Sequence, residues 1–242
     1  MLPCPGPFNY SAINNTAVRA ATGEIVLLLN NDIDIIHSDW LREMVSLAVR
    51  PDVGAVGSKL IYGNETIQHA GVVLGTGSFY DERGVAGHYG LNLPAEDVGL
   101  QGYMSLMREA GAVTGACLAV RKAVFEQVGG LDENNLAISF NDVDFCLRLR
   151  DAGFRNIWTP FARLYHLESA SRGDDMAPDK IERFSREVRY MRERWGPVLD
   201  SDPFYNENFS RVDHSFKLAF PARRRKPWLR IAEAGDAHAR PI

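Results

Sequence analysis

The sequence has few cysteines, no long apolar run and no excess of positive charge. Its three cysteines, Cys4, Cys117 and Cys146, lack the spacing of zinc ligands and are too few for a disulfide framework. No apolar run approaches the length of about 20 residues that spans a membrane, and no signal peptide follows Met1. The net charge is -4, whereas binding to a nucleic-acid backbone calls for a basic surface. These absences predict a globular protein of a reducing compartment that binds no nucleic acid.

One aliphatic run followed by polar residues organises the chain. The run Ile25–Leu29 is typical of a strand that is buried on both faces in the middle of a parallel sheet. Asn30, Asn31, Asp32 and Asp34 follow at its carboxyl end, where open α/β sheets bind their ligands. Two carboxylates with one residue between them can hold a divalent cation that neutralises a diphosphate. The same residues are about equally common as plain turn formers, so the pattern alone leaves both interpretations open.

The rest of the chain predicts an α/β protein with a sheet flanked by helices. Because the first strand needs neighbours that nothing upstream supplies, we expect the amino-terminal strands of this sheet to be missing. Residues 1–198 are expected to form the remaining part of one domain, and residues 199–242 an extension. Strands are expected over 53–61, 68–74 and 112–120, and helices over 11–21, 38–50, 122–128, 141–153 and 178–195.

The helix that begins near Asn141 carries a carboxylate suited to catalysis. Asp144 and Arg148 are four residues apart, so we expect them to pair on its exposed side. Asp142 lies on the apolar side and points inward, with no partner in its own helix. Such a group is a candidate general base, although the helix dipole alone also favours a carboxylate in the first turn.

A histidine and two basic segments are further candidates for binding a metal or an anionic group. His166 ends an extended segment, and it becomes a candidate ligand only if the fold brings it to Asp34. Arg172 lies in the polar, glycine-containing loop that follows, which could fold over a bound diphosphate. The basic run Arg223–Lys226 is interpreted as a solvated tail, with contact to acidic lipid headgroups as the alternative.

Three classes of function fit these residues. The first is metal-assisted transfer from a nucleoside diphosphate sugar, with Asp34 on the metal and Asp142 as the base. The second is phosphoryl transfer with Asp32 as the nucleophile, although Ile35 and Ile36 stand where that chemistry usually has a hydroxyl residue. The third is a sugar-binding or scaffolding module, or a catalytically incompetent fragment.

Several segments together resemble one family of enzymes. Segments 7–15 and 27–34 look like the approach to an Asp-x-Asp motif, 114–117 like a donor-and-acceptor strand, and 129–133 like the turn after it. Segment 140–146 looks like a catalytic acidic motif with Asn141 in place of the usual Glu, and 166–173 like a histidine-and-loop element. Over about residues 7–210 the sequence resembles the inverting glycosyltransferases of family 2, and segment 202–206 looks like the tail of O-antigen and rhamnan-type members.

This resemblance implies the GT-A fold, a Rossmann-type mixed sheet flanked by helices, and a role for each motif. Asp142 would deprotonate the acceptor hydroxyl, whose attack would invert the anomeric configuration. Asp34 would bind Mn²⁺ or Mg²⁺, and His166 would complete the metal shell. The donor, a UDP- or dTDP-sugar, would be contacted by Asn31, Asp32, Gly115 and Arg172.

The resemblance also implies partners and a location. The acceptor would be a polysaccharide or a lipid-linked glycan, which places the protein in the cytoplasm, with peripheral contact at the inner face of the plasma membrane. Family members carry further strands before the segment that begins at Pro7, and these hold the nucleotide base. We therefore expect this chain alone to bind its donor poorly.

Overall fold

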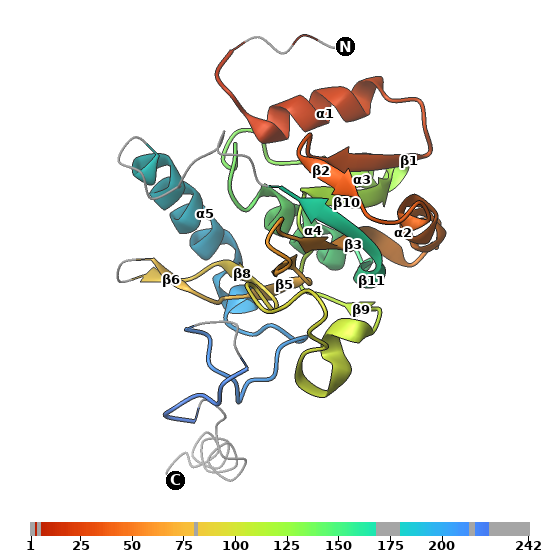
Figure 1. The fold of residues 1–242 in the computed structure, drawn as a ribbon. Coiled ribbons are helices and arrows are strands. Elements are labelled where there is room, and N and C mark those ends of the chain that lie inside the picture. The colour runs from red at the N-terminus through yellow and green to blue at the C-terminus, as the bar shows by residue number, and fades with distance from the viewer. Residues whose placement is uncertain (1–2, 4–5, 80–81, 168–179, 213–215, 223–242) are drawn as a thin grey trace, which may run out of the picture.

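The protein contains one large mixed sheet with helices on both sides (Figure 1). The computed structural model describes residues 3, 6–79, 82–167, 180–212 and 216–222. The main path of the sheet is β1–β10–β3–β11–β2, with β4 added to β3 and β9 to β11. These strands are β1 (Ile25–Leu29), β2 (Ile33–Ile35), β3 (Val53–Ile61), β4 (Ile67–His69), β9 (Arg108–Glu109), β10 (Cys117–Arg121) and β11 (Arg155–His166).

Helices and short ladders complete the fold. Segment 75–110, for which the sequence predicted neither a strand nor a helix, contains short strands and a 3₁₀ helix. These are β6 (Ser78–Phe79), β7 (Glu82–Arg83), β8 (Ala86–His88), η1 (Leu100–Ser105) and β9, while β5 (Val72–Leu74) pairs with β8. The α-helices are α1 (Tyr10–Ala20), α2 (Trp40–Ala48), α3 (Lys122–Gln127), α4 (Asn141–Asp151) and α5 (Ile181–Leu199). In the described part of the chain, no helix is both long and apolar enough to cross a bilayer.

β1 is an outer strand of the described sheet and not a central one. It pairs antiparallel with β10, and none of the other described strands pairs with it. Val26 and Leu28 are buried, whereas Leu29 is 45% exposed. The prediction of a strand buried on both faces of a parallel sheet is therefore wrong. A run of aliphatic residues does not reveal which edge is paired or which alternate side chains reach the core.

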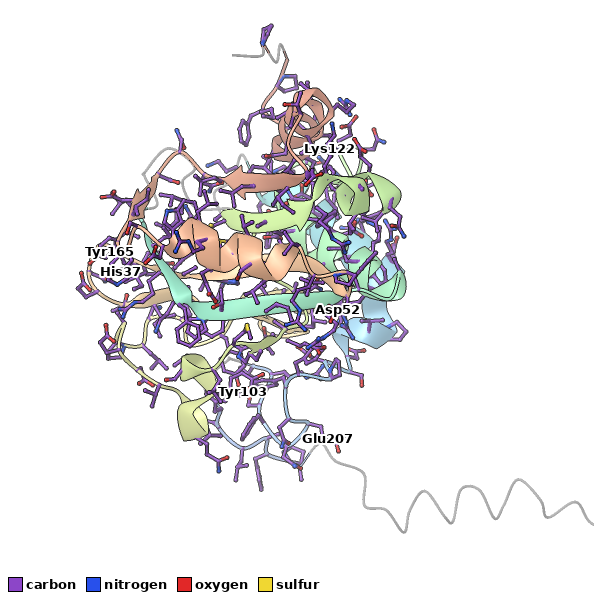
Figure 2. The ribbon with its side chains drawn as sticks, turned by 90° about the vertical axis from the view of Figure 1, so that its right-hand side faces the viewer. His37, Asp52, Tyr103, Lys122, Tyr165 and Glu207 are labelled. Carbon is purple, nitrogen blue, oxygen red and sulfur yellow. The ribbon has the colours of Figure 1, made fainter. Side chains whose placement is uncertain are left out.

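Each face of the sheet has its own apolar core. Cys117 and Ala119 of β10 pack in the cluster that contains Met44 of α2, and α2 lies across the front of the sheet in Figure 2. Leu118 and Val120 belong to the larger cluster on the other face, which includes residues of α3, α4 and α5. Successive side chains of a strand point to opposite faces, so one short strand contributes to both cores.

α4 is covered by α5, which changes the environment of its ion pair. The predicted pair is confirmed, because Arg148 Nε donates to Asp144 Oδ2 at 2.8 Å. Its predicted exposure is wrong: Asp144 is fully buried and also accepts a hydrogen bond from Trp195 Nε1 at 2.8 Å. The sequence of α4 shows which residues share a side, but not that α5 packs against that side.

α5 continues past residue 195, where the helix was expected to end, through Gly196 and Pro197. Pro197 lies in the last turn, where its missing N–H removes a single helical hydrogen bond. Leu199 is fully buried beyond it, and the amide of Asp200 still donates to the carbonyl of Gly196 at 3.0 Å. Burial of the last turn therefore outweighs the local preference of proline to stop a helix.

The segment after α5 packs back on the body of the protein. Asp202 Oδ2 accepts a hydrogen bond from the Leu74 amide, and Oδ1 accepts one from the Phe204 amide, both at 2.8 Å. Tyr205 is buried, and the Tyr103 hydroxyl donates to the Phe204 carbonyl at 2.9 Å. Burial raises the pKa of Asp202 above its usual value. The basic run 223–226 lies outside the described residues.

We predict that Asp202→Ala lowers the free energy of unfolding by about 2–3 kcal/mol, because two backbone amides lose their buried acceptor. Urea denaturation followed by circular dichroism measures this change. Glu193→Ala is the matched control, because Glu193 is an exposed carboxylate of α5. A loss no larger than that of the control would show that Asp202 does not anchor the segment.

Candidate active site

Strand directions bring three polar segments to one edge of the sheet. β10 is antiparallel to both β1 and β3, and β11 is parallel to β3, so β1, β3 and β11 run in the same direction. Their carboxyl ends therefore share the edge at which β10 begins. The turn 30–32, the segment 114–116 and the end of β11 lie there, and ligands of open α/β sheets bind at such an edge.

His166 is the centre of the first group of contacts. Its Nε2 atom lies 3.0 Å from Asp32 Oδ1 and 3.3 Å from Asn30 Nδ2. Its Nδ1 atom lies 2.6 Å from Gln68 Oε1 of β4. The amide of Leu167 donates to the Asp32 carbonyl at 2.9 Å, which fixes the turn against the end of β11.

Asp34 lies apart from this group. It is opposite Tyr165 in the antiparallel ladder between β2 and β11, whereas His166 is opposite Ile33. Paired residues share a face and successive residues alternate, so Asp34 and His166 point to opposite faces. Asp34 is exposed, and its Oδ1 accepts a hydrogen bond from the Ile35 amide at 2.9 Å. The structure thus brings Asp32, and not Asp34, to His166.

Two other residues singled out in the sequence are not placed in this group. Asn31 is exposed in the turn between β1 and β2. Arg172 lies outside the described residues. The expected donor contacts of both remain predictions.

Asp142 is held at the start of α4 by backbone amides. Its Oδ2 accepts a hydrogen bond from the Gly115 amide and its Oδ1 one from the Val143 amide, both at 2.8 Å. The Tyr10 hydroxyl donates to the Gly115 carbonyl at 2.8 Å. A Cβ at position 115 would lie 3.1 Å from the Tyr10 hydroxyl and 3.5 Å from Asp142 Cβ. Glycine therefore permits the close approach of the segment before β10 to α4.

A side chain of α5 holds the backbone segment just before α4 by hydrogen bonds. Phe140 has a φ of 61°, a left-handed backbone conformation that residues other than glycine rarely adopt. The carboxylate of Glu187 accepts hydrogen bonds from the amides of Ile138 and Ser139 at 3.0 and 3.3 Å. Such strain persists where the surroundings enforce it, and it is often found at functional sites.

The two groups are joined through neighbouring backbone. The Asn30 amide donates to the Ala116 carbonyl at 2.9 Å, and the adjacent Gly115 amide holds Asp142. Asn30 also contacts His166, so a short series of hydrogen bonds connects Asp142 to His166 and Asp32. A carboxylate–imidazole pair and a second carboxylate therefore lie at the same edge.

β4 contributes two residues that the sequence analysis did not single out. Gln68 contacts His166, and the next residue, His69, is fully buried. His69 Nε2 accepts a hydrogen bond from the Thr114 amide at 3.4 Å, and its Nδ1 lies 2.8 Å from His88 Nδ1. Burial, with a smaller contribution from His88, holds the pKa of His69 well below its usual value. The available signal was that two of the three residues of this short, buried strand are polar.

The sequence matches the family described as Glycosyltransferase like family 2 over residues 6–189. This chain belongs to that family. It is 50% identical over 215 residues to protein y4gI of Sinorhizobium fredii, and 42% identical over 205 residues to the O-antigen biosynthesis protein RfbC of Myxococcus xanthus. These matches cover 89% and 84% of this chain but 23% and 15% of the two relatives. The chain thus spans less than a quarter of the length of either relative.

The fold is also found among solved glycosyltransferases. The crystal structure of GalNAc-T7 with UDP, GalNAc and Mn²⁺ has a TM-score of 0.50 to this chain at 13% identity. The match covers 85% of this chain and 46% of that one. At this identity the likeness shows the fold alone, and it confirms the GT-A-like mixed sheet expected from the sequence.

We predict that His69 makes the stability of the protein depend on pH. Its folded-state pKa lies well below the usual histidine value of about 6.5, so in acid the unfolded chain binds a proton that the native state excludes. Stability from this residue is complete above about pH 6.5 and falls by up to about 1.4 kcal/mol per pH unit below it. Urea unfolding between about pH 5 and pH 7.5 measures this slope.

His69→Gln is expected to flatten the slope, because glutamine takes up no proton in this range. His37→Gln, at an exposed histidine, is the control and should leave the slope unchanged. Equal slopes for the wild type and His69→Gln would refute the assignment.

Proposed function

We propose that this chain is the catalytic part of an inverting glycosyltransferase that depends on a divalent cation. It transfers a sugar from a nucleoside diphosphate sugar to a hydroxyl of a glycan acceptor. The observation that carries the proposal is the joint position of the Asp32–His166 pair and Asp142 at one edge of the sheet. The O-antigen biosynthesis protein of Myxococcus xanthus, 42% identical, supports an acceptor in cell-surface polysaccharide assembly.

The pair formed by Asp32 and His166 fits a divalent cation that is shared with a diphosphate. Among the described residues, no group of three histidine, cysteine or acidic side chains could hold a metal ion. Mg²⁺ and similar ions are commonly held by one or two protein ligands, with substrate phosphates and water supplying the rest. Neighbouring ligands of an octahedral ion with bonds of about 2.1 Å lie about 3.0 Å apart. The Asp32–His166 separation is 3.0 Å. When bound, the cation neutralises charge on the departing diphosphate.

Asp142 is suited to accept the proton of the acceptor hydroxyl. Each of its oxygens receives one backbone N–H, and each keeps a second lone-pair site. The hydroxyl oxygen attacks the anomeric carbon as Asp142 takes its proton, and the bond from that carbon to the diphosphate breaks on the opposite side. The configuration inverts because a single displacement occurs. Gly115 and Tyr10 hold the carboxylate in place for this step.

The donor and acceptor follow from the family resemblance. We propose a UDP- or dTDP-sugar as the donor and a polysaccharide or lipid-linked glycan as the acceptor. A lipid-linked acceptor would bring the protein to the inner face of the plasma membrane. No observation of the structure favours the phosphoryl-transfer alternative, in which the carboxylate of Asp32 would be the nucleophile.

We predict that, in a protein that also carries the amino-terminal donor-binding strands implied by the family resemblance, Asp142→Asn lowers the rate of sugar transfer by about 10²–10⁴-fold while donor binding stays close to that of the wild type. The amide still accepts a backbone hydrogen bond but cannot take a proton. Transfer is measured by release of the nucleoside diphosphate, and donor binding by calorimetry with Mn²⁺. Asp151→Asn, at the exposed end of the same helix, is the control.

Turnover of Asp142→Asn within a few-fold of the control would reduce Asp142 to a helix-capping residue. The trapping of a phospho-aspartate at position 32 would instead identify the protein as a phosphoryl-transfer enzyme. Donor binding with no transfer by the wild type would favour a sugar-binding module.

We predict that, in a protein that also carries the amino-terminal donor-binding strands implied by the family resemblance, Asp32→Asn abolishes Mn²⁺-dependent binding of UDP, whereas Asp34→Asn retains it. Asp32 contacts His166, and Asp34 points to the other face of the β2–β11 ladder. Calorimetric titration of UDP with and without Mn²⁺ separates the two carboxylates, which are matched in chemistry and lie two residues apart. If only Asp34→Asn loses Mn²⁺-dependent UDP binding, Asp34 is the metal ligand, as the family resemblance implies, and Asp32 is not.

A further inference from the structure

Gln68 is a buried polar residue that the proposed mechanism does not use. It is 6% exposed in the middle of β4, between the fully buried Ile67 and His69. Its Oε1 atom lies 2.6 Å from His166 Nδ1, which is short for a hydrogen bond to a ring nitrogen. A buried amide is retained where its hydrogen bond has a specific partner, and here that partner is the imidazole at the candidate site.

The two amides on His166 select the same tautomer. A carboxamide oxygen only accepts, so Gln68 Oε1 requires a proton on Nδ1. A carboxamide nitrogen only donates, so Asn30 Nδ2, 3.3 Å from Nε2, requires a lone pair there. Both contacts therefore describe an imidazole with its hydrogen on Nδ1 and its lone pair on Nε2.

This tautomer directs the lone pair of Nε2 at the carboxylate of Asp32, 3.0 Å away. Two electron-rich atoms at this distance repel one another, and a cation bound by both converts the repulsion into attraction. Histidine ligands of metals commonly donate their second N–H to an oxygen acceptor, which fixes both the ring and its tautomer. Gln68 supplies such an acceptor to His166.

β4 is well placed to hold Gln68 still. It pairs with β3, and the neighbouring His69 accepts hydrogen bonds from the amides of Gly71 and Thr114 at 3.3 and 3.4 Å. Hydrogen bonds therefore tie β4 to β3 and to the segment that begins at Thr114. A side chain on a rigid strand positions its partner more accurately than one on a loop.

We propose that Gln68 is a positioning residue that holds His166 in the Nδ1–H tautomer, so that Nε2 is available to a divalent cation shared with Asp32. This inference rests on the metal site of the proposed function. It adds the reason why the imidazole presents Nε2, and it gives β4 a role in the site. The inference does not depend on which sugar or which acceptor the protein uses.

The tautomer is tested by ¹⁵N NMR of the histidine rings in the metal-free protein. The His166 signals are identified by their absence from the spectrum of His166→Asn. The wild type and Gln68→Glu are expected to show the Nδ1–H form, because either side chain accepts from Nδ1. Gln68→Leu should lose this preference. Ile67→Val, a buried change in the same strand, is the control and should keep it.

The consequence is tested by titrating Mn²⁺, followed by electron paramagnetic resonance, in the same proteins. Gln68→Leu is expected to bind Mn²⁺ about 10–100-fold more weakly than Ile67→Val, and Gln68→Glu should stay within a few-fold of the wild type. Equal affinities of Gln68→Leu and Ile67→Val would overturn the proposal.

The two experiments fail in different ways. An Nε2–H tautomer in the wild type, together with normal Mn²⁺ binding, would overturn the role of Gln68 and leave the metal site standing. Absence of Mn²⁺ binding by the wild type would overturn the metal site of the proposed function, and with it the inference on Gln68.

Discussion

The antiparallel ladder between β2 and the end of β11 determines which side chains meet at the candidate site. Its register sets His166 opposite Ile33 and Tyr165 opposite Asp34. Because side chains alternate between faces, this register separates Asp34 from His166. Asp32, in the turn just before β2, is left against the imidazole. The choice between the two carboxylates thus depends on the strand register, which backbone hydrogen bonds set.

A second constraint joins this pair to the candidate base. The segment 115–116 donates to Asp142 on one side and accepts from Asn30 on the other, so a shift of one group would move the other. The carboxylate of Glu187 and the buried Asp144–Trp195 contact fix α5 against α4, and α4 carries Asp142. A family 2 glycosyltransferase needs its base and its diphosphate site at a constant separation. The turn 30–32 and the segment 115–116 supply these contacts, and each lies directly beside a strand of the sheet.

The sequence was a good guide to local elements and a poor guide to their neighbours. The run Ile25–Leu29 has the predicted bounds, yet its edge position and partial exposure were missed because pairing is a long-range property. The Asp144–Arg148 pair follows from helical spacing, whereas its burial depends on α5, whose Trp195 lies 51 residues after Asp144. Gln68 and His69 carried too weak a signal, because polar residues in a short strand are informative only once their partners are known.

The amino-acid sequence by itself determined the α/β class and the family. These depend on residue type and on spacing within single elements, which short-range geometry converts directly into structure. Only the tertiary structure decided that Asp32 meets His166, that Gly115 holds Asp142, and that β4 supports the imidazole. Each of these contacts joins residues from separate elements. Their geometry is set by strand register and helix packing, which no local pattern specifies.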